Sequence, residues 1–369
     1  MMSILIFIFT IGILVFVHEL GHFIFAKKTG MLVEEFAIGF PPRIFSFKKG
    51  ETKYSIGLIP IGGFVKIHGE DYTEENGADK KDKNFSSRFT SRPKWAQALV
   101  LIAGVSFNFL LAWALISLGF MSGLPVSVNQ FENARVTDTS LMLFDVLSDS
   151  PAEKAGLETG DIILYLSAGK DESVQDFANI EMAQDFIALR GEQEIEILYK
   201  RGLETALTHL TPQEGLLEGR VAIGVTWDIV GKVKFPFFQA LWEGAKMTVA
   251  LTAGTITGLF YLAGDVFTGN GDLSQISGPL GIVSLVGSAF QFGFVYLLSF
   301  VALISINLAI INLIPIPALD GGRLLFVVIE AIKGSPIKTK IANGLNLTGF
   351  ALLILLMLVI TVSDLFKIF

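Results

Sequence analysis

Long apolar segments alternate with polar stretches along this chain, and several approach the length that crosses a bilayer. Mostly uncharged runs cover residues 4–25 and 96–120, a third ends near residue 314, and a fourth covers 347–366. A helix needs about 20 consecutive apolar residues to span the hydrocarbon core. The pattern therefore predicts four transmembrane helices in a polytopic α-helical membrane protein.

The segment 235–267 is also apolar, but Glu243, Lys246 and several glycines interrupt it. Such a segment fits either a span or a helix that lies along the membrane surface. We expect the surface helix, because one extra crossing would place Asp320 on the opposite side of the membrane from His22. The site predicted below needs these two residues at one depth.

A different pattern occupies residues 52–68, where aromatic and β-branched residues flank Pro60, Gly62 and Gly63. This pattern predicts a membrane-associated β-hairpin on the cytoplasmic side, covered by protein because unpaired strands cannot lie in lipid. Its edge could pair with an extended peptide, so we expect Ile61, Gly62 and Gly63 to contact substrate. The alternative is an ordinary cytoplasmic hairpin.

Between residues 126 and 215 the apolar runs are short and separated by turn residues, as in a small α/β domain. Ser150 and Pro151 predict the start of a short helix that Gly156 ends. Strands are expected at 144–147, 162–164, 194–199 and 206–210, with a longer helix near 174–189. On the residues Ser150–Leu157 and Gly160–Ile163, this order resembles a PDZ domain of the circularly permuted bacterial kind. Such a domain binds extended peptides or filters substrates by size, and both alternatives stay open.

These segments divide the chain into four expected regions. They are an N-terminal membrane core at 1–125, a PDZ domain at 126–215, a membrane-surface linker at 216–296 and a C-terminal membrane core at 297–369.

Composition and charge agree with a membrane protein. Hydrophobic residues make up 51% of the chain and charged residues 17%, which is too apolar for a soluble protein of this length. Lysine and arginine gather between residues 27 and 94 and again at 333–340, so these loops are expected in the cytoplasm, with the N-terminus and the α/β domain outside. No basic residue precedes Lys27, so we expect the first segment to be retained rather than cleaved. We expect the lipid bilayer as surroundings and no nucleic-acid partner.

The first apolar segment carries three ionisable side chains, His18, Glu19 and His22, in the pattern H-E-x-x-H. Positions i and i+4 share a helix face, so both imidazoles can meet one metal ion, and the glutamate can activate a water molecule. Ionisable groups inside a span are functional candidates by default. The alternative, a buried histidine pair satisfied by hydrogen bonds, is disfavoured within a span.

A catalytic zinc takes three protein ligands and keeps one open position. The chain has no cysteine, so histidine and carboxylate must supply the ligands. Asp320 is the candidate, since it follows the helix-interrupting Pro315 and Pro317 and precedes two glycines that allow a tight turn. Alone it would read as a helix cap. With H-E-x-x-H present, we predict Zn²⁺ held by His18, His22 and Asp320, with Glu19 as the catalytic base.

H-E-x-x-H together with the run from Asn312 to Gly322 (N-x-x-P-x-P-x-L-D-G-G) resembles the site-2 protease family of intramembrane zinc metalloproteases, in its bacterial regulator-of-sigma-E protease branch. The resemblance implies a protease of the bacterial plasma (inner) membrane that hydrolyses a peptide bond within single-span substrates, such as anchored anti-sigma factors or remnant signal peptides. It implies an active site near the cytoplasmic side and a substrate-holding role for Asn312. Two departures stand out: one PDZ unit where the best-known members have two, and Gly104–Asn108, which matches the family's G-P-x-x-N pattern loosely.

Two other classes of function are weighed. A non-enzymatic membrane scaffold would use the PDZ unit as its working part and keep the polar span residues for structure. A metal transporter would want further ionisable residues along several spans, and few are present.

Overall fold

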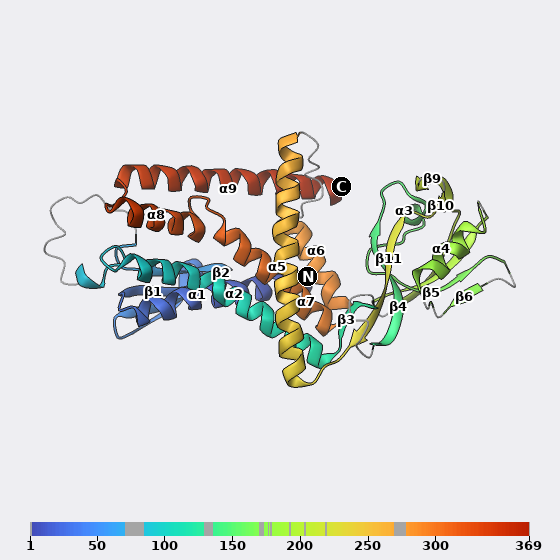
Figure 1. Ribbon diagram of the computed structural model, residues 1–369, viewed down its shortest axis with the longest axis horizontal. Coiled ribbons are helices and arrows are strands. Elements are labelled where there is room, and N and C mark those ends of the chain that lie inside the picture. The colour runs from blue at the N-terminus through green and yellow to red at the C-terminus, as the bar shows by residue number, and fades with distance from the viewer. Residues whose placement is uncertain are drawn as a thin grey trace. The chain divides into compact units, whose positions relative to one another are not determined.

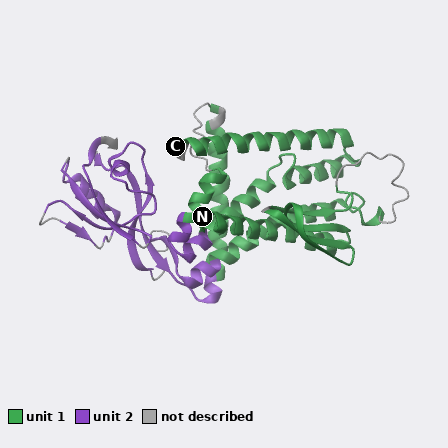
Figure 2. Cartoon of the chain, turned by 180° about the vertical axis from the view of Figure 1, so that it is seen from behind, with its two compact units in different colours: residues 1–116, 241–287, 300–369 green, residues 117–240, 288–299 purple. Residues whose placement is uncertain are grey.

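The computed structural model describes residues 2–70, 85–128, 136–169, 173–175, 177, 179–191, 193–202, 204–217, 220–268 and 278–368. The chain divides into two compact units, coloured separately in Figure 2. Unit 1 comprises residues 1–116, 241–287 and 300–369, and unit 2 comprises residues 117–240 and 288–299.

Long apolar helices build unit 1. The four predicted spans fall within α1 (Met2–Lys28), α2 (Lys94–Ser122), α7 (Phe294–Leu313) and α9 (Thr339–Ile368). The helices α1 and α2 touch closely, because a Cβ atom added at Gly21 of α1 would lie 2.5 Å from the Ala103 carbonyl oxygen of α2. Small residues at such a contact let two backbones approach.

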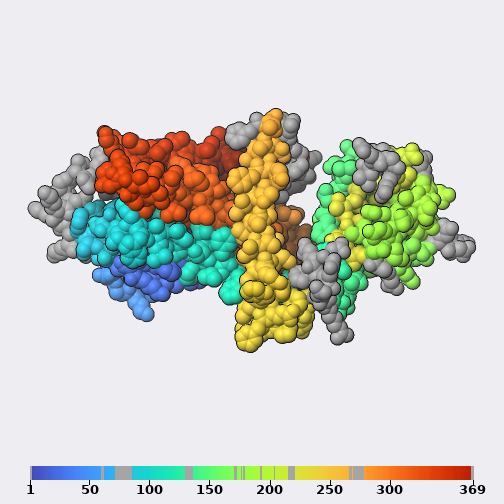
Figure 3. All heavy atoms as spheres, viewed as in Figure 1, coloured from blue at the N-terminus to red at the C-terminus, as the bar shows by residue number. Residues whose placement is uncertain are grey.

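Helix α5 (Phe237–Thr268) is the fifth helix of the described chain that is long and apolar enough to cross a membrane. The count of four spans therefore stays a prediction. In Figure 1 α5 runs across the direction of α9, and in Figure 3 it is open to the surface along its length; only 6% of its most apolar window is buried. Helix α9, a predicted span, is equally exposed, so a position of α5 along the membrane surface stays a prediction.

Two shorter helices complete unit 1. Helix α6 (Pro279–Gln291) has 13 residues, too few to span. The buried Asp364 of α9 accepts hydrogen bonds from the backbone N–H groups of Gly278 (3.1 Å) and Gly281 (2.9 Å), which ties the start of α6 to the last helix. Helix α8 (Asp320–Lys333) begins at the predicted third ligand.

The sheet of unit 1 corrects the predicted hairpin. Residues 52–67 form one strand, β2 (Thr52–Ile67), whose partner is β1 (Val33–Lys49), with the turn at Gly50. The segment Pro60–Gly63, predicted to be the turn, lies inside β2. The predicted pairing was wrong because the start of β1 lies between the two halves of β2: Ala37 faces both Ser55 and Phe64, so the two halves pair with β1 and not with each other. Pairing between distant residues leaves little trace in the local sequence.

One buried charge in this sheet is fully paired. Glu35 accepts hydrogen bonds from Arg43 Nε (2.7 Å) and Ser55 Oγ (2.6 Å). Burial raises the pKa of Glu35, but the hydrogen bonds from Ser55 and Arg43 outweigh it and leave that pKa below its ordinary value. The carboxylate of Glu35 is therefore paired within the sheet.

Unit 2 contains a seven-stranded sheet in the order β3-β11-β4-β5-β7-β8, with β6 paired to β5. The strands are β3 (Leu124–Ser127), β4 (Val136–Val146), β5 (Ile162–Ser167), β6 (Ser173–Gln175), β7 (Ile195–Arg201), β8 (Glu204–Leu210) and β11 (Val225–Val233). A separate pair, β9 (Gln213–Leu217) and β10 (Arg220–Ala222), precedes β11. A 3₁₀ turn at Phe85–Ser87, in unit 1, precedes α2.

Two short helices of unit 2 begin where their caps predict. Ser150 Oγ accepts from the Glu153 N–H (3.2 Å) at the start of α3 (Pro151–Lys154), and the positive φ of Gly156 follows its end, as predicted. The helix expected near 174–189 is shorter. Asn179 caps α4 (Ile180–Ala188), and the residues before it form β6 instead.

The boundaries drawn at residues 126, 215 and 216 need correction. Strand β11 pairs with both β3 and β4, so residues 225–233 lie within the sheet of unit 2 and not in a membrane-surface linker. The side chains of Trp227 and Ile229 are part of its core. For the part from α5 onward, a membrane-surface linker stays a prediction. The partners of this strand lie some 80 to 110 residues earlier, so the local sequence does not show that it joins this sheet.

Arg201 holds a buried carboxylate in unit 2. Its guanidinium donates to Asp161 Oδ1 and Oδ2 (both 2.7 Å), and Asp161 is fully buried.

Replacing Arg201 by methionine should lower the free energy of unfolding of unit 2 by about 3 kcal/mol, since Asp161 loses its positive partner. Urea-dependent proteolysis of the full chain in detergent measures this loss. The control Lys232→Met breaks an exposed ion pair with Asp138 and should cost under about 1 kcal/mol. Equal losses of unfolding free energy in the two variants would contradict the role of Arg201 as the stabilising partner of Asp161.

Candidate metal centre

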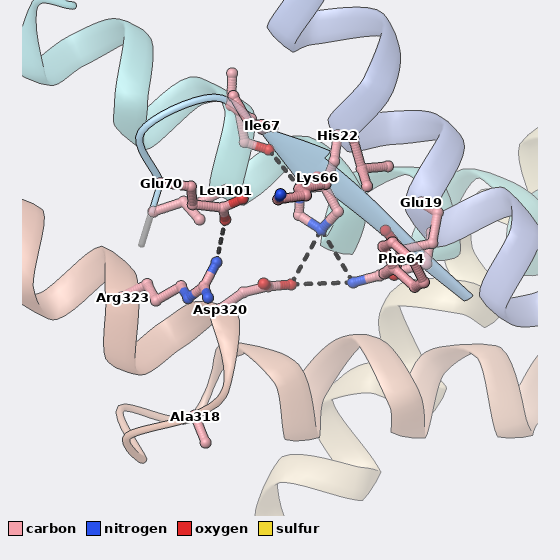
Figure 4. A pocket seen from close by; sticks show the side chains of 13 residues that line it. Glu19, His22, Phe64, Lys66, Ile67, Glu70, Leu101, Ala318, Asp320 and Arg323 are labelled. Carbon is pink, nitrogen blue, oxygen red and sulfur yellow. Dashed lines mark hydrogen bonds and ion pairs between the residues drawn. The ribbon is translucent and has the colours of Figure 1, made fainter. Parts of the chain in front are cut away.

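Three potential metal ligands meet in unit 1. His18 and His22 come from α1, and Asp320 comes from the first position of α8. The Nε2 atoms of the two histidines lie 3.1 Å apart, and they lie 3.0 Å (His18) and 3.2 Å (His22) from Asp320 Oδ2. Figure 4 shows Asp320 reaching from the start of α8 toward His22. The structure thus brings together the three residues that the sequence singled out, although roughly 300 positions separate the two segments.

The local structure explains how these side chains are aimed. The four-residue spacing on α1 puts both imidazoles on one face, with ring centroids 4.7 Å apart and planes at 82°. Helix α7 ends at Leu313, before the two prolines, and α8 starts at Asp320. Leu319 occupies the cap position without a side-chain hydrogen bond, so Asp320 does not serve as the N-cap of α8.

Gly321 and Gly322 are required by space. A Cβ atom at Gly321 would lie 2.3 Å from the Leu313 carbonyl oxygen, and one at Gly322 would lie 2.2 Å from the Ile316 carbonyl oxygen. Real side chains do not approach a carbonyl so closely. The two glycines let the first turn of α8 pack against the proline-containing segment that precedes it, which fixes the position of Asp320.

A cavity of about 410 Å³ opens beside the three ligands. Glu19 lines it together with residues of β2, and the Val65 backbone forms a hydrogen bond with the Glu19 carboxylate. The side chains of His18 and His22 are 8% and 10% exposed, and that of Asp320 is 21% exposed. The cluster is therefore largely shielded from solvent but reachable from one side, where Glu19 stands.

The residues present fit a zinc ion. Two imidazoles and one carboxylate form a ligand set that catalytic zinc sites use, with a further position left for water or substrate. All three donor atoms lie within 4.8 Å of one another. The chain has no cysteine to offer as an alternative ligand.

None of the four predicted substrate-contacting residues is part of the described lining of the cavity, and among the described residues one of them contacts the site. Gly63 is near the base, since a Cβ atom added there would lie 3.5 Å from Glu19 Cγ. Gly62 faces the ring of Phe40, and Asn312 is half-buried in the last turn of α7. The side chain of Ile61 is outside the described part of the chain. A substrate role for these four residues stays a prediction.

Several residues at the site were not predicted from the sequence. The carbonyl oxygen of Val100 and the side chain of Asn108, both on α2, contact the two histidines. Arg323 of α8 pairs with Glu70 at the edge of the cavity (Figure 4). The four-residue spacing of Val100, Gly104 and Asn108 was the available signal, because it places them on one helix face. Without the partner helix, that face could not be assigned to the site.

Comparison with known proteins gives one family. The model of peptidase family M50 matches residues 6–356. The regulator of sigma-W protease RasP of Bacillus subtilis is 32% identical, with 93% of each chain covered. The zinc metalloprotease RasP of Oceanobacillus iheyensis is 32% identical over the whole of both chains, and a putative zinc metalloprotease of Clostridium perfringens is 32% identical over 92% of this chain and 91% of its own.

Gly104 provides a test of the metal centre. A Cβ atom there would lie 2.3 Å from His22 Nε2 and 2.9 Å from His18 Cε1, so Gly104→Ala must displace an imidazole. Overpacking of this kind costs about 1–3 kcal/mol, which corresponds to a roughly 5–150-fold loss of zinc affinity. Competition with a chromogenic chelator in detergent measures the loss. Gly258→Ala on α5 is the control, since nothing lies within 4 Å of its added Cβ. Unchanged affinity in Gly104→Ala would contradict the placement of zinc.

Proposed function

The chain belongs to peptidase family M50, the site-2 type of zinc metalloprotease, and we propose that it hydrolyses a peptide bond of its substrates within the membrane, at the centre formed by His18, His22 and Asp320. One observation carries the proposal: the donors of a zinc site converge from α1 and α8 beside Glu19, in a cavity among apolar helices. Family membership leaves the non-enzymatic scaffold and the metal transporter without support.

Each residue has a distinct role in the proposed reaction. His18, His22 and Asp320 hold the ion, and zinc supplies the Lewis acidity that polarises a carbonyl and makes water acidic at neutral pH. Glu19 accepts the proton of the attacking water and delivers it to the leaving amide nitrogen. The hydrogen bond from Val65 orients the Glu19 carboxylate toward the cavity. The shielded surroundings strengthen these electrostatic interactions.

The substrate in this proposal is a single membrane span that unwinds locally. A helical peptide bond is occupied by its own hydrogen bonds, so the segment at the metal must become extended. Strand β2 lies beside Glu19 at Gly63 and Val65, where its backbone supports pairing with an extended segment. Asn312 would hold the unwound backbone nearby.

We assign the protein to the plasma membrane of a bacterium, with the metal centre toward the cytoplasm and unit 2 outside. The basic residues between 27 and 94 support this orientation. The Bacillus subtilis relative is named a regulator of sigma-W protease. By extension, membrane-anchored anti-sigma factors are the proposed substrates, with remnant signal peptides as a second class.

Glu19→Gln tests the proposed mechanism. The amide cannot accept a proton, so cleavage of a single-span substrate in detergent or vesicles should fall by at least about 10²–10⁴-fold. Zinc content should stay at the level of the unaltered protein, because Glu19 is not a ligand. Glu243→Gln on α5 is the matched control and should cleave normally. A Glu19→Gln variant that cleaves at the normal rate would refute the base role.

Unit 2 is proposed to be a PDZ-like domain that captures peptide ends. A groove of about 580 Å³ runs between α4 and the start of β11, lined by Ile187, Ala188 and the segment 221–227. Strand β3 pairs only with Val230–Val233 of β11 among the described residues, which leaves the edge at Val225–Asp228 for strand addition. This edge and groove favour peptide capture over filtering by size.

Ala188→Arg should block this groove. Binding of a short apolar peptide with a free carboxyl end, followed by fluorescence polarisation on the full chain, should weaken at least about tenfold, since an arginine fills the space an apolar side chain would take. Leu189→Arg changes the next residue, which is exposed and outside the groove, and should leave binding intact. Absence of peptide binding in the unaltered protein would favour the filter.

A further inference from the structure

One face of α2 forms the back wall of the histidine pair. Val100, Gly104 and Asn108 follow one another at intervals of four residues and share this face. Gly104 gives the imidazoles their space, and the other two residues contact the ring nitrogens that point away from Asp320.

The contact of His22 with this face of α2 determines which of its two ring nitrogens carries the proton. Its Nδ1 lies 2.9 Å from the Val100 carbonyl oxygen, which can only accept a hydrogen bond. The proton of a neutral His22 ring is therefore on Nδ1. Its Nε2, directed toward Asp320, is left with a free lone pair for a metal ion.

His18 meets the side chain of Asn108 at the equivalent nitrogen. The amide nitrogen of Asn108 lies 3.2 Å from His18 Nδ1. Asn108 is fully buried, and its amide oxygen has no hydrogen-bond partner among the described residues. A buried oxygen without a donor is unfavourable, and an amide group reverses its two ends by turning over.

The two ends of the amide have opposite consequences for zinc. With its nitrogen toward His18, Asn108 donates to Nδ1 and leaves the ring proton on Nε2, where a metal cannot bind. With its oxygen toward His18, Asn108 accepts the Nδ1 proton and frees Nε2. The second arrangement also gives the buried amide oxygen of Asn108 a hydrogen-bond donor. It matches His22, whose Nδ1 likewise faces an oxygen acceptor.

We propose that Asn108 is a positioning residue that holds His18 in the Nδ1-protonated tautomer through its amide oxygen, so that both histidines offer Nε2 to zinc. Val100 does the same for His22 through its backbone. This inference rests on the proposed metal centre. Partners of this kind behind metal-bound histidines are typically worth about 10–100-fold in metal affinity.

Three variants of the full chain in detergent test the proposal by chelator competition. Asn108→Leu removes the acceptor and should weaken zinc binding about 10–100-fold. Asn108→Asp keeps an acceptor and should bind zinc at least as tightly as the unaltered protein. Asn307→Leu makes the same change on α7, where Asn307 accepts from Thr255, and should leave zinc affinity unchanged. Zinc binding by Asn108→Leu at full strength would overturn the proposal, as would equal losses in all three variants.

A second experiment, by ¹⁵N NMR spectroscopy, does not require the Asn108→Leu variant to fold. In the full chain carrying His68→Gln and His209→Gln, only His18 and His22 remain to report in ¹⁵N spectra of labelled histidine. Zinc should bind through Nε2 of both rings, with Nδ1 protonated. Zinc bound through Nδ1 of His18 would overturn the role of Asn108. His18→Ala separates the two levels of inference, since retention of zinc by that variant would refute the metal centre itself.

Discussion

The close contact between α1 and α2 is the interaction on which the metal centre depends. Gly21 lets α1 approach the Ala103 carbonyl, and Gly104 leaves room for both imidazoles against α2. Without this contact the two histidines would face lipid or an empty space, and their ring nitrogens would lack partners. Because unpaired polar groups are unfavourable among apolar helices, the packing of the two helices and the polar contacts of the site stabilise each other.

The same rule governs the other buried polar groups. Glu35 is paired by Arg43 and Ser55, and Asp364 is satisfied by two backbone N–H groups at the start of α6. The hydrogen bond from Ser55 joins β2 to Glu35 of β1, and Asp364 joins α9 to the start of α6, so these polar groups also connect two parts of their unit. Asn108 follows this pattern only when its oxygen faces His18, and this is why its orientation bears on the metal.

The broken path of the chain between α7 and α8 gives the site its third ligand. A continuous helix through residues 313–320 would place the aspartate at a different depth and angle. The prolines end α7, and the two glycines allow α8 to restart against the same segment. Asp320 is therefore positioned by backbone packing, and its carboxylate remains free of the capping role that it would otherwise play.

Much of this protein was determined by the sequence alone. Apolar runs near the length of a bilayer predicted the long helices, because hydrophobic length is a local property, and the H-E-x-x-H spacing predicted a paired-histidine face for the same reason. The tertiary structure decided what depends on distant neighbours: the pairing of β2 with β1, the inclusion of β11 in the sheet of unit 2, and the contact of Asn108 with His18. A strand's partner and a helix's buried face are set by packing between elements, and a residue such as Asn108 carries no local mark of the ring it will face.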